Sequence, residues 1–226
     1  MDFNNRGDIL LSLVLLNLSI LNHSLQKIPK ATVMEDRLTI YPADNIQWRK
    51  WLESNHLKCK GIWLIYNKKI KGGELPGLSW SEAVDTALCF GWIDSKKLPI
   101  DEKKFMQFFS KRNPKSGWSK INKEKAENLI ELGLMTGAGL RIIEAAKYDG
   151  SWNALDAVEK LIMPKELALI LDEHNHCKVF FTSLSNSVKK SVFYWLLSAK
   201  REETRNRRVA EILRFTSEGK LPKQFS

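Results

Sequence analysis

The first half of the chain alternates hydrophobic and polar positions with the periods of short helices and strands. Trp48, Trp51 and Leu52 recur at the spacing of one helix face, directly after a capping pattern at Asp44. The run that follows Gly61 is apolar on both faces and rich in aromatic and β-branched residues, which is typical of a buried strand. The predicted elements are a helix over 44–55, a strand over 61–69, a Gly/Pro-rich loop over 71–78, a helix over 79–90, and an antiparallel hairpin from strands at 92–94 and 105–109. The second helix opens with a capping box formed by Ser79, Trp80, Ser81 and Glu82.

From Asn113 onward the pattern follows the helical period alone. The predicted helices cover 119–132, 136–149, a segment that begins at Pro164, and then 178–184, 187–199 and 202–218. The first of these is expected to stop at Gly133, and the second to be capped by Thr136 and to stop at Gly150. Strands in the first half and helices in the second predict an α+β fold, with a small antiparallel sheet and packed helices in the N-terminal half and a helical C-terminal half. We divide the chain into a doubtful leader (1–33), an α+β domain (34–150) and a helical domain (151–226).

The leader contains a continuous apolar stretch from Ile9 to Leu21. This stretch is shorter than the ~20 residues that a helix needs to cross a bilayer. Three interpretations stay open, in this order: an upstream extension ahead of a true start at Met34, a membrane-attached helix over 9–26, and a signal peptide. The last has little support, because Asp8 nearly cancels the charge of Arg6 and no small-residue cleavage site follows.

Composition indicates a folded protein with an uneven charge. Of the 226 residues, 43% are hydrophobic and 27% charged, which is ordinary for a globular chain, and eight Trp with ten Phe are enough to fill a core. The net charge of +10 is concentrated at 95–125 and 189–214, which hold ten and eight Lys/Arg against three acids each. Such segments attract phosphates or an anionic membrane, or simply face water.

No motif in the sequence specifies a cofactor or a metal. There is no phosphate-binding glycine loop, dinucleotide fingerprint, nucleophile elbow or zinc-protease motif. His174 and His176 are two residues apart, so on a helix they point in different directions and do not favour a metal site. Three scattered cysteines are what a reducing cytoplasm tolerates, and we predict a cytoplasmic protein.

The first candidate site lies at the predicted hairpin. Asp94 begins one strand and Arg112 follows the other, so the two are expected to form a charge-assisted hydrogen bond. In the functional interpretation, Trp92 and Trp118 are the aromatic walls of a pocket, and Arg112 or Lys115 contacts an anion. In the structural interpretation, the charged pair ties the hairpin ends together and both indoles are core. The candidate residues are Trp92, Asp94, Arg112, Lys115, Ser116 and Trp118.

The second candidate site is the face of the last helix. At helical spacing, Arg201, Thr204, Arg205 and Arg208 lie on one side, next to Lys200. Guanidinium groups on one face form a phosphate or carboxylate site. The alternative is a solvated face balanced by Glu202 and Glu203. The candidate residues here are Lys200, Thr204, Arg205 and Arg208.

Several separate strings carry a family resemblance. The strings are ALCFGWID, FSKRNPKSGWS, GLMTGAGL, AAKYDGSW and SAKREETRNRRV, spread in order over approximately residues 38–220. Together they resemble the YdeI/OmpD-associated (bacteriocin-protection) family, and the last string is similar to its C-terminal OmpD-associated helical domain. The resemblance implies a bacterial cytoplasmic protein linked with resistance to bacteriocins, cationic peptides or related stress. It implies no reaction and no catalytic residue.

Three functions remain open from the sequence. The first is a non-enzymatic protein that binds an anionic small ligand or a protein partner. The second is non-specific nucleic-acid binding through the two basic segments, and the third is an enzyme with Asp94 as base and Arg112 as anion holder. We favour the first, and expect membrane association only if 9–26 is a genuine part of the protein.

Overall fold

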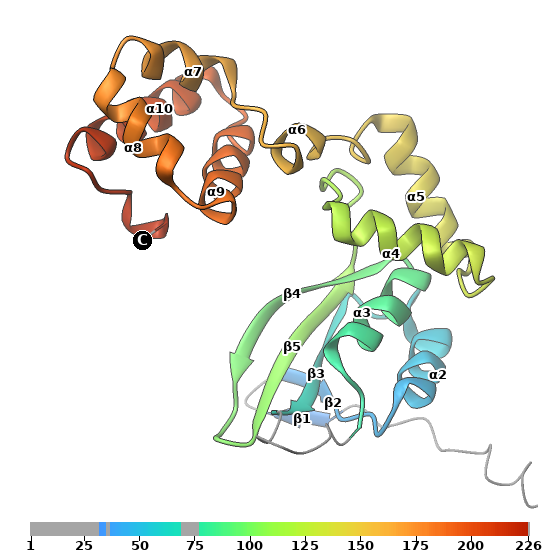
Figure 1. Cartoon of the computed structure of the whole chain (residues 1–226). Helices are drawn as coiled ribbons and strands as arrows, with labels where there is room; N and C mark the ends of the chain where they lie inside the picture. Colours follow the sequence, from blue (N-terminus) through green and yellow to red (C-terminus); the bar gives the residue numbers. More distant parts are fainter. Residues whose placement is uncertain (1–31, 35–36, 69–76, 226) are drawn as a thin grey trace, which may run out of the picture. The chain divides into compact units, whose positions relative to one another are not determined.

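The computed structural model describes residues 32–34, 37–68 and 77–225 (Figure 1). The predictions for the apolar stretch 9–21 and most of the leader therefore lie outside the described residues, as does most of the predicted loop at 71–78. The described part begins with a short strand at Thr32–Met34, so the last two leader residues are part of a sheet. Across the described ranges, no helix is both long and apolar enough to cross a bilayer.

The described strands form one five-stranded sheet in the order β1-β2-β3-β5-β4. The strands are β1 (Thr32–Met34), β2 (Arg37–Ile40), β3 (Gly61–Asn67), β4 (Trp92–Pro99) and β5 (Lys104–Lys111). Strands precede most of the helices, so the predicted α+β fold is confirmed. The expected antiparallel sheet is mixed, because β2 pairs with β3 in parallel. The helix between these strands returns the chain to its starting end, which a parallel pair requires.

Two helices cover one face of the sheet, α2 (Asn45–Asn55) and α3 (Trp80–Cys89) (Figure 1). Both begin at the predicted caps: Asp44 accepts from the backbone of Gln47 at 2.8 Å, and Ser79 and Glu82 form a complete capping box. The indole of Trp48 donates to the carbonyl of Ala83 at 3.0 Å and ties α2 to α3. Aromatic and aliphatic side chains fill the space beneath these helices: Trp48, Trp51, Leu52, Ile62, Leu64, Val84, Leu88, Trp92, Met106 and Phe109.

The predicted β4–β5 hairpin is present and longer than expected. Its register places Trp92 opposite Lys111 and Asp94 opposite Phe109, and then shifts between Asp94 and Lys97. Such a shift is a β-bulge, which changes the direction of the side chains that follow it.

Two further helices follow the hairpin, α4 (Lys120–Glu131) and α5 (Gly137–Asp149). They end near Gly133 and Gly150, whose φ angles of 67° and 80° are the left-handed values that the sequence predicts at these stops. Thr136 stands at the start of α5, but its hydroxyl donates to the carbonyl of Cys89 at 2.5 Å.

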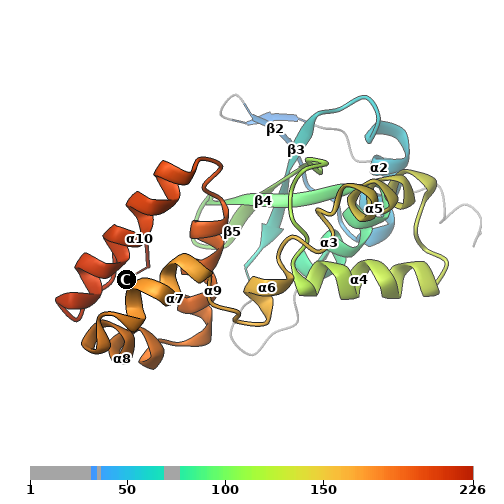
Figure 2. The same cartoon turned by 90° about the horizontal axis from the view of Figure 1, so that it is seen from above.

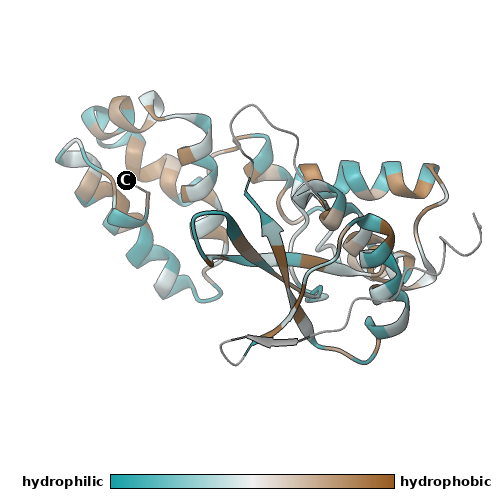
Figure 3. Ribbon diagram, turned by 90° about the horizontal axis from the view of Figure 1, so that it is seen from below, coloured by the Kyte–Doolittle hydropathy of each residue, from teal (hydrophilic) through white to brown (hydrophobic). Residues whose placement is uncertain are grey.

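The remaining chain is helical. It comprises α6 (Asp156–Glu159), α7 (Lys165–Asp172), α8 (Asn175–Ser183), α9 (Asn186–Leu197), α10 (Glu202–Ser217) and a 3-10 turn at Lys223–Phe225. Helix α10 contacts α7, α8 and α9 (Figures 1 and 2). These helices carry apolar and polar sectors side by side (Figure 3), and their apolar sectors enclose a core that includes Leu167, Phe181, Phe193 and Ile212.

The chain divides into two compact units. Of the described residues, those up to 112 and those at 129–141 form the first unit, and those at 113–128 and from 142 onward form the second. The division runs through α4 and α5, and the predicted domain boundary after residue 150 falls within the second unit.

Candidate binding pockets

The predicted pair between Asp94 and Arg112 is not formed. Oδ2 of Asp94 accepts from the indole Nε1 of Trp80 at 3.0 Å and from Nε2 of Gln107 at 2.9 Å. The backbone of Arg112 instead donates to the carbonyl of Gly91 at 2.9 Å. The hairpin register thus leaves Arg112 three positions away from Phe109, the residue opposite Asp94.

Arg112 and the two predicted indole walls are buried. Arg112 is 6% exposed, and burial lowers its pKa to about 10, so its guanidinium stays charged at neutral pH. The indole of Trp92 donates to the carbonyl of His56 at 3.2 Å within the core of the first unit. Trp118 packs on Trp152 with ring centroids 4.8 Å apart in the second unit. The two indoles are therefore core residues of different units.

Lys115 and Ser116 belong to the turn that leads to α4. The backbone of Lys115 donates to Oδ1 of Asn113 at 3.0 Å, and the hydroxyl of Ser116 donates to the carbonyl of Asn113 at 2.7 Å. The side chain of Lys115 is exposed. The hydroxyl of Ser151 donates to the carbonyl of Pro114 at 3.2 Å, so a residue that follows α5 also holds this turn.

The predicted basic face of α10 contributes contacts within the helical region. Nη1 of Arg205 donates to Oε1 of Glu166 at 3.1 Å, and Nη2 donates to the carbonyl of Ala199 at 3.3 Å. Arg208 lies 4.8 Å from the ring centroid of Trp195 and donates to the carbonyl of the same residue. These arginines connect α10 to α7 and to the end of α9. Lys200 is exposed before α10, and Thr204 is half-buried in its first turn.

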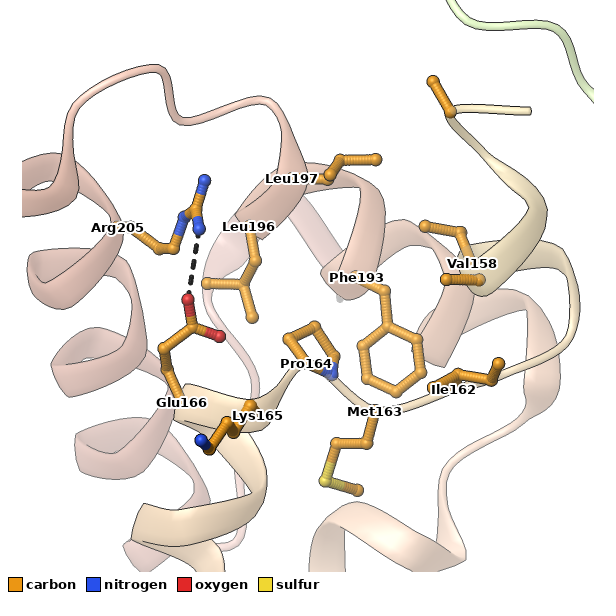
Figure 4. A pocket seen from close by; sticks show the side chains of 12 residues that line it. Val158, Ile162, Met163, Pro164, Lys165, Glu166, Phe193, Leu196, Leu197 and Arg205 are labelled. Carbon is orange, nitrogen blue, oxygen red and sulfur yellow. Dashed lines mark hydrogen bonds and ion pairs between the residues drawn. The ribbon is translucent and has the colours of Figure 1, made fainter. Parts of the chain in front are cut away.

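A pocket of about 420 Å³ opens beside Arg205 (Figure 4). Arg205 and Glu166 lie on one side of it and Val158 and Ile162 on the other, with Leu196, Pro164 and Phe193 between them. Apolar side chains form most of its wall, which is lined by Ala154, Ala157, Val158, Ile162, Met163, Pro164, Lys165, Glu166, Phe193, Leu196, Leu197 and Arg205. The sequence therefore identified one polar residue of this pocket, although not its apolar wall.

The charges of this pocket lie where the start of α7 meets Arg205 of α10. Lys165 and Arg205 are cationic and Glu166 is anionic, so the lining carries one net positive charge. The backbone N–H of Glu166 and the side chain of Arg205 both hold the pKa of the Glu166 carboxyl below its ordinary value. Glu166 therefore stays ionised and fixes the guanidinium against the pocket wall.

Two protein families match different parts of the chain. Residues 160–219 match the family described as "Bacteriocin-protection, YdeI or OmpD-Associated". This match lies in the C-terminal region, and we call the matched residues 160–219 the OmpD-associated domain. Residues 40–142 match a separate family, described as a domain of unknown function (DUF8412). No curated protein and no solved structure matches the chain.

The pocket belongs largely to the OmpD-associated domain. All of its lining residues lie within the matched segment 160–219 except Ala154, Ala157 and Val158, which come just before it. The resemblance to the YdeI/OmpD-associated family was expected over 38–220, and the family match supports it for the C-terminal part of that range.

The sequence did not identify Glu166 as the partner of Arg205, or Trp80 as a partner of Asp94. Glu166 follows Pro164 at a predicted helix start, and an acid in a first turn reads as a cap rather than as an arginine partner. Trp80 was expected only as part of a capping box, yet it binds Asp94 from fourteen residues away. Both contacts join different elements, so no local spacing rule identifies them.

Proposed function

We propose that this chain is a binding protein rather than an enzyme, and that its OmpD-associated domain binds an amphipathic small molecule with an anionic end. The observation that supports this proposal is the apolar pocket of about 420 Å³ with Arg205 on its wall. Its volume is within the range of small-molecule sites, which are mostly apolar with a few polar groups that orient the ligand.

The two parts of such a ligand have separate positions in the pocket. An apolar body contacts the wall formed by Val158, Ile162 and Phe193. An anionic end lies at Arg205, whose guanidinium has five N–H donors and uses one for Glu166 and one for Ala199. Arginine recognises carboxylates with geometric specificity, so the anionic group sets the orientation of the ligand.

The biological role that we propose follows the family description. That description connects the domain with bacteriocin protection, and we propose that ligand binding in the bacterial cytoplasm contributes to such protection or to a related stress response. The free thiols of Cys59, Cys89 and Cys177 support a reducing compartment.

The alternatives lack a comparable observation. Several cations of the two basic segments already form ion pairs: Lys120 with Glu124, Lys123 with Asp156, and Lys190 with Glu159. A nucleic-acid site needs such charges to be available for phosphates. The enzyme hypothesis required Asp94 and Arg112 to act together, and Asp94 is bonded to Trp80 and Gln107 instead.

Calorimetric titration with straight-chain carboxylates and with alcohols of equal length tests the proposal. We expect the carboxylates to bind, with an affinity that rises by roughly 0.8 kcal/mol for each added methylene until the pocket is full. Arg205→Gln is expected to weaken carboxylate binding by about tenfold, the loss of one charge-assisted hydrogen bond, and to leave alcohol binding unchanged. Ala157→Phe, which adds volume at the pocket wall, is expected to weaken both series.

Arg207→Gln is the matched control, because Arg207 is exposed on the same helix and does not line the pocket. It removes the same charge and is expected to leave every affinity unchanged. Absence of binding to the unmodified protein would overturn the proposal, and so would equal losses in Arg205→Gln and Arg207→Gln.

A further inference from the structure

A second pocket, of about 350 Å³, lies in the first unit. Its described lining residues are Trp80, Asp94, Lys97, Phe105 and Gln107. Trp80 is the first residue of α3, and the other four belong to the β4–β5 hairpin. The pocket therefore lies on the face of the sheet that α3 covers, in the region that matches the domain of unknown function.

The β-bulge brings the two charged residues of this pocket to one face. Residues three apart on a regular strand point to opposite faces. The register shift places Asp94 opposite Phe109 and Lys97 opposite Gln107, and these partners are two apart on β5. Asp94 and Lys97 consequently share a face, which an unbroken strand would not allow. Bulges commonly redirect side chains next to functional sites.

The carboxylate of Asp94 has one oxygen atom that accepts no hydrogen bond from the described residues. Both hydrogen bonds to Asp94, from Trp80 and from Gln107, reach Oδ2. Among the described residues, no group donates to Oδ1. The carboxylate is thus held in one orientation by two neutral donors, and no cation of the described residues forms an ion pair with it. Oδ1 is available to accept from a ligand.

The positive charge, on Lys97, is close by, and no described carboxylate pairs with it. Nζ of Lys97 lies 4.1 Å from the ring centroid of Phe105 in a cation–π contact. Lys97 is exposed, and within the described structure it forms no ion pair with Asp94. Its flexible four-carbon stem allows the ammonium to follow a bound group. The pocket therefore holds one carboxylate and one ammonium that do not pair with each other.

We propose that this pocket binds a free zwitterionic α-amino acid. The ligand's ammonium donates to Oδ1 of Asp94, its carboxylate accepts from Nζ of Lys97, and its side chain lies against the indole of Trp80. A ligand with only a positive charge would be repelled by the ammonium of Lys97, and a ligand with only a negative charge would be repelled by the carboxylate of Asp94. Complementary charges at both ends select against each of these. A volume of about 350 Å³ is at the small end of ligand sites, which suits an amino acid.

Calorimetry on the full chain with three related probes tests this proposal. Phenylalanine carries both charges, its N-acetyl derivative lacks the ammonium, and its amide lacks the carboxylate. We expect phenylalanine to bind at least tenfold more tightly than either derivative. Asp94→Asn is expected to remove the preference for the amino acid over the N-acetyl form, and Lys97→Gln the preference over the amide.

The control is Lys96→Gln, because Lys96 is exposed next to Lys97 and does not line the pocket. It is expected to leave all three affinities unchanged. Circular dichroism of Asp94→Asn checks that the hairpin is retained. Lys97 is exposed, so Lys97→Gln is expected to leave the fold intact and tests the proposal without that check.

Two outcomes would overturn the amino-acid assignment. If the amide binds as tightly as phenylalanine, the pocket is a site for organic cations only, and if none of the probes binds, it is not an amino-acid site. The result is independent of the carboxylate site, because Arg205 lies in the other unit. Arg205→Gln is expected to leave phenylalanine binding unchanged.

Discussion

At the scale of single residues, Gly139 is the position where one added methyl group is expected to cost most. Gly139 is buried in α5, and a Cβ there would lie 2.5 Å from the carbonyl oxygen of Cys89 and 2.8 Å from that of Leu88. Backbone oxygens of α3 cannot move away without disturbing that helix. We expect Gly139→Ala to lower the free energy of unfolding by about 1–3 kcal/mol, the usual cost of overpacking, although alanine favours a helix.

Gly137 provides the matched control on the same helix. A Cβ there would approach only Nη1 of Arg141, at 3.4 Å, and that flexible side chain can move. Gly137→Ala is expected to leave stability unchanged or to raise it. Urea denaturation of both variants measures the difference. Equal stabilities would show that the close approach of α5 to α3 does not constrain Gly139.

Individual contacts were the least predictable level of this protein. The residues of the hairpin were identified correctly, yet the partner of Asp94 depends on the register, on a bulge and on where α3 begins. Trp92 and Trp118 show the same problem, because an indole fits a pocket wall and a core equally well until its neighbours are known. Burial decided both in favour of the core.

At the scale of elements, an ion-pair network joins α4, α6 and α9 within the second unit. Oε2 of Glu159 accepts from Nζ of Lys190 at 2.7 Å, and Oε1 accepts from the backbone of Lys120 at 3.3 Å. These contacts, with that of Lys190 the largest, hold the pKa of Glu159 below its ordinary value of 4.5. A carboxyl whose pKa is lower in the folded state stabilises the fold above its unfolded pKa, and this contribution is lost as the pH falls through the folded pKa.

Glu159→Gln is therefore expected to destabilise the protein in a pH-dependent manner. At pH 7 we expect a loss of roughly 0.5–1 kcal/mol, because solvent screens this partly exposed pair. The difference from the unmodified protein is expected to shrink below about pH 4.5. Glu124→Gln is the control, since the ion pair of Glu124 with Lys120, at 3.7 Å, is exposed on both sides. A pH-independent loss in Glu159→Gln would rule out an electrostatic origin.

Elements were more predictable than contacts because their signals are local. The caps at Asp44 and Ser79 and the stops at Gly133 and Gly150 act within one helical turn, and the structure confirms each of them. The parallel pairing of β2 with β3 was not predictable in the same way. Strand direction depends on how the chain crosses between strands, and no periodicity encodes it.

At the scale of the whole molecule, the α+β order followed directly from where strand and helix periods occur. The change of pattern at Asn113 coincides with the start of the second unit, whereas the predicted domain boundary was placed after residue 150. The pocket of the OmpD-associated domain was not visible, because its wall combines side chains from α6, α7, α9 and α10. Only Arg205 stood out, as a charge at helical spacing from other charges.

The helical domain has a core of its own, which leads to a prediction about folding. Its buried cluster runs from Val158 to Ile212, with partly buried side chains that extend to Phe225. No residue of this cluster comes from the described part of the first unit. We therefore expect a fragment of residues 151–226 to fold alone, and so to support the predicted domain boundary. Its stability is expected to be marginal, because small domains bury a smaller share of their surface.

Far-ultraviolet circular dichroism and thermal melting of this fragment are the measurements. We expect helical ellipticity and one cooperative transition, since small domains unfold in a two-state manner. Phe193→Ala, which removes a ring 6.0 Å from that of Phe181, is expected to cost about 3–5 kcal/mol and to abolish the transition. Arg207→Gln is expected to leave the transition in place.

Medium-chain carboxylates are expected to raise the midpoint of this transition, because a ligand that binds only the folded state stabilises it. A fragment with helical ellipticity but no cooperative transition would mean that the core needs residues before 151, among which Lys120 and Lys123 of α4 contact α6.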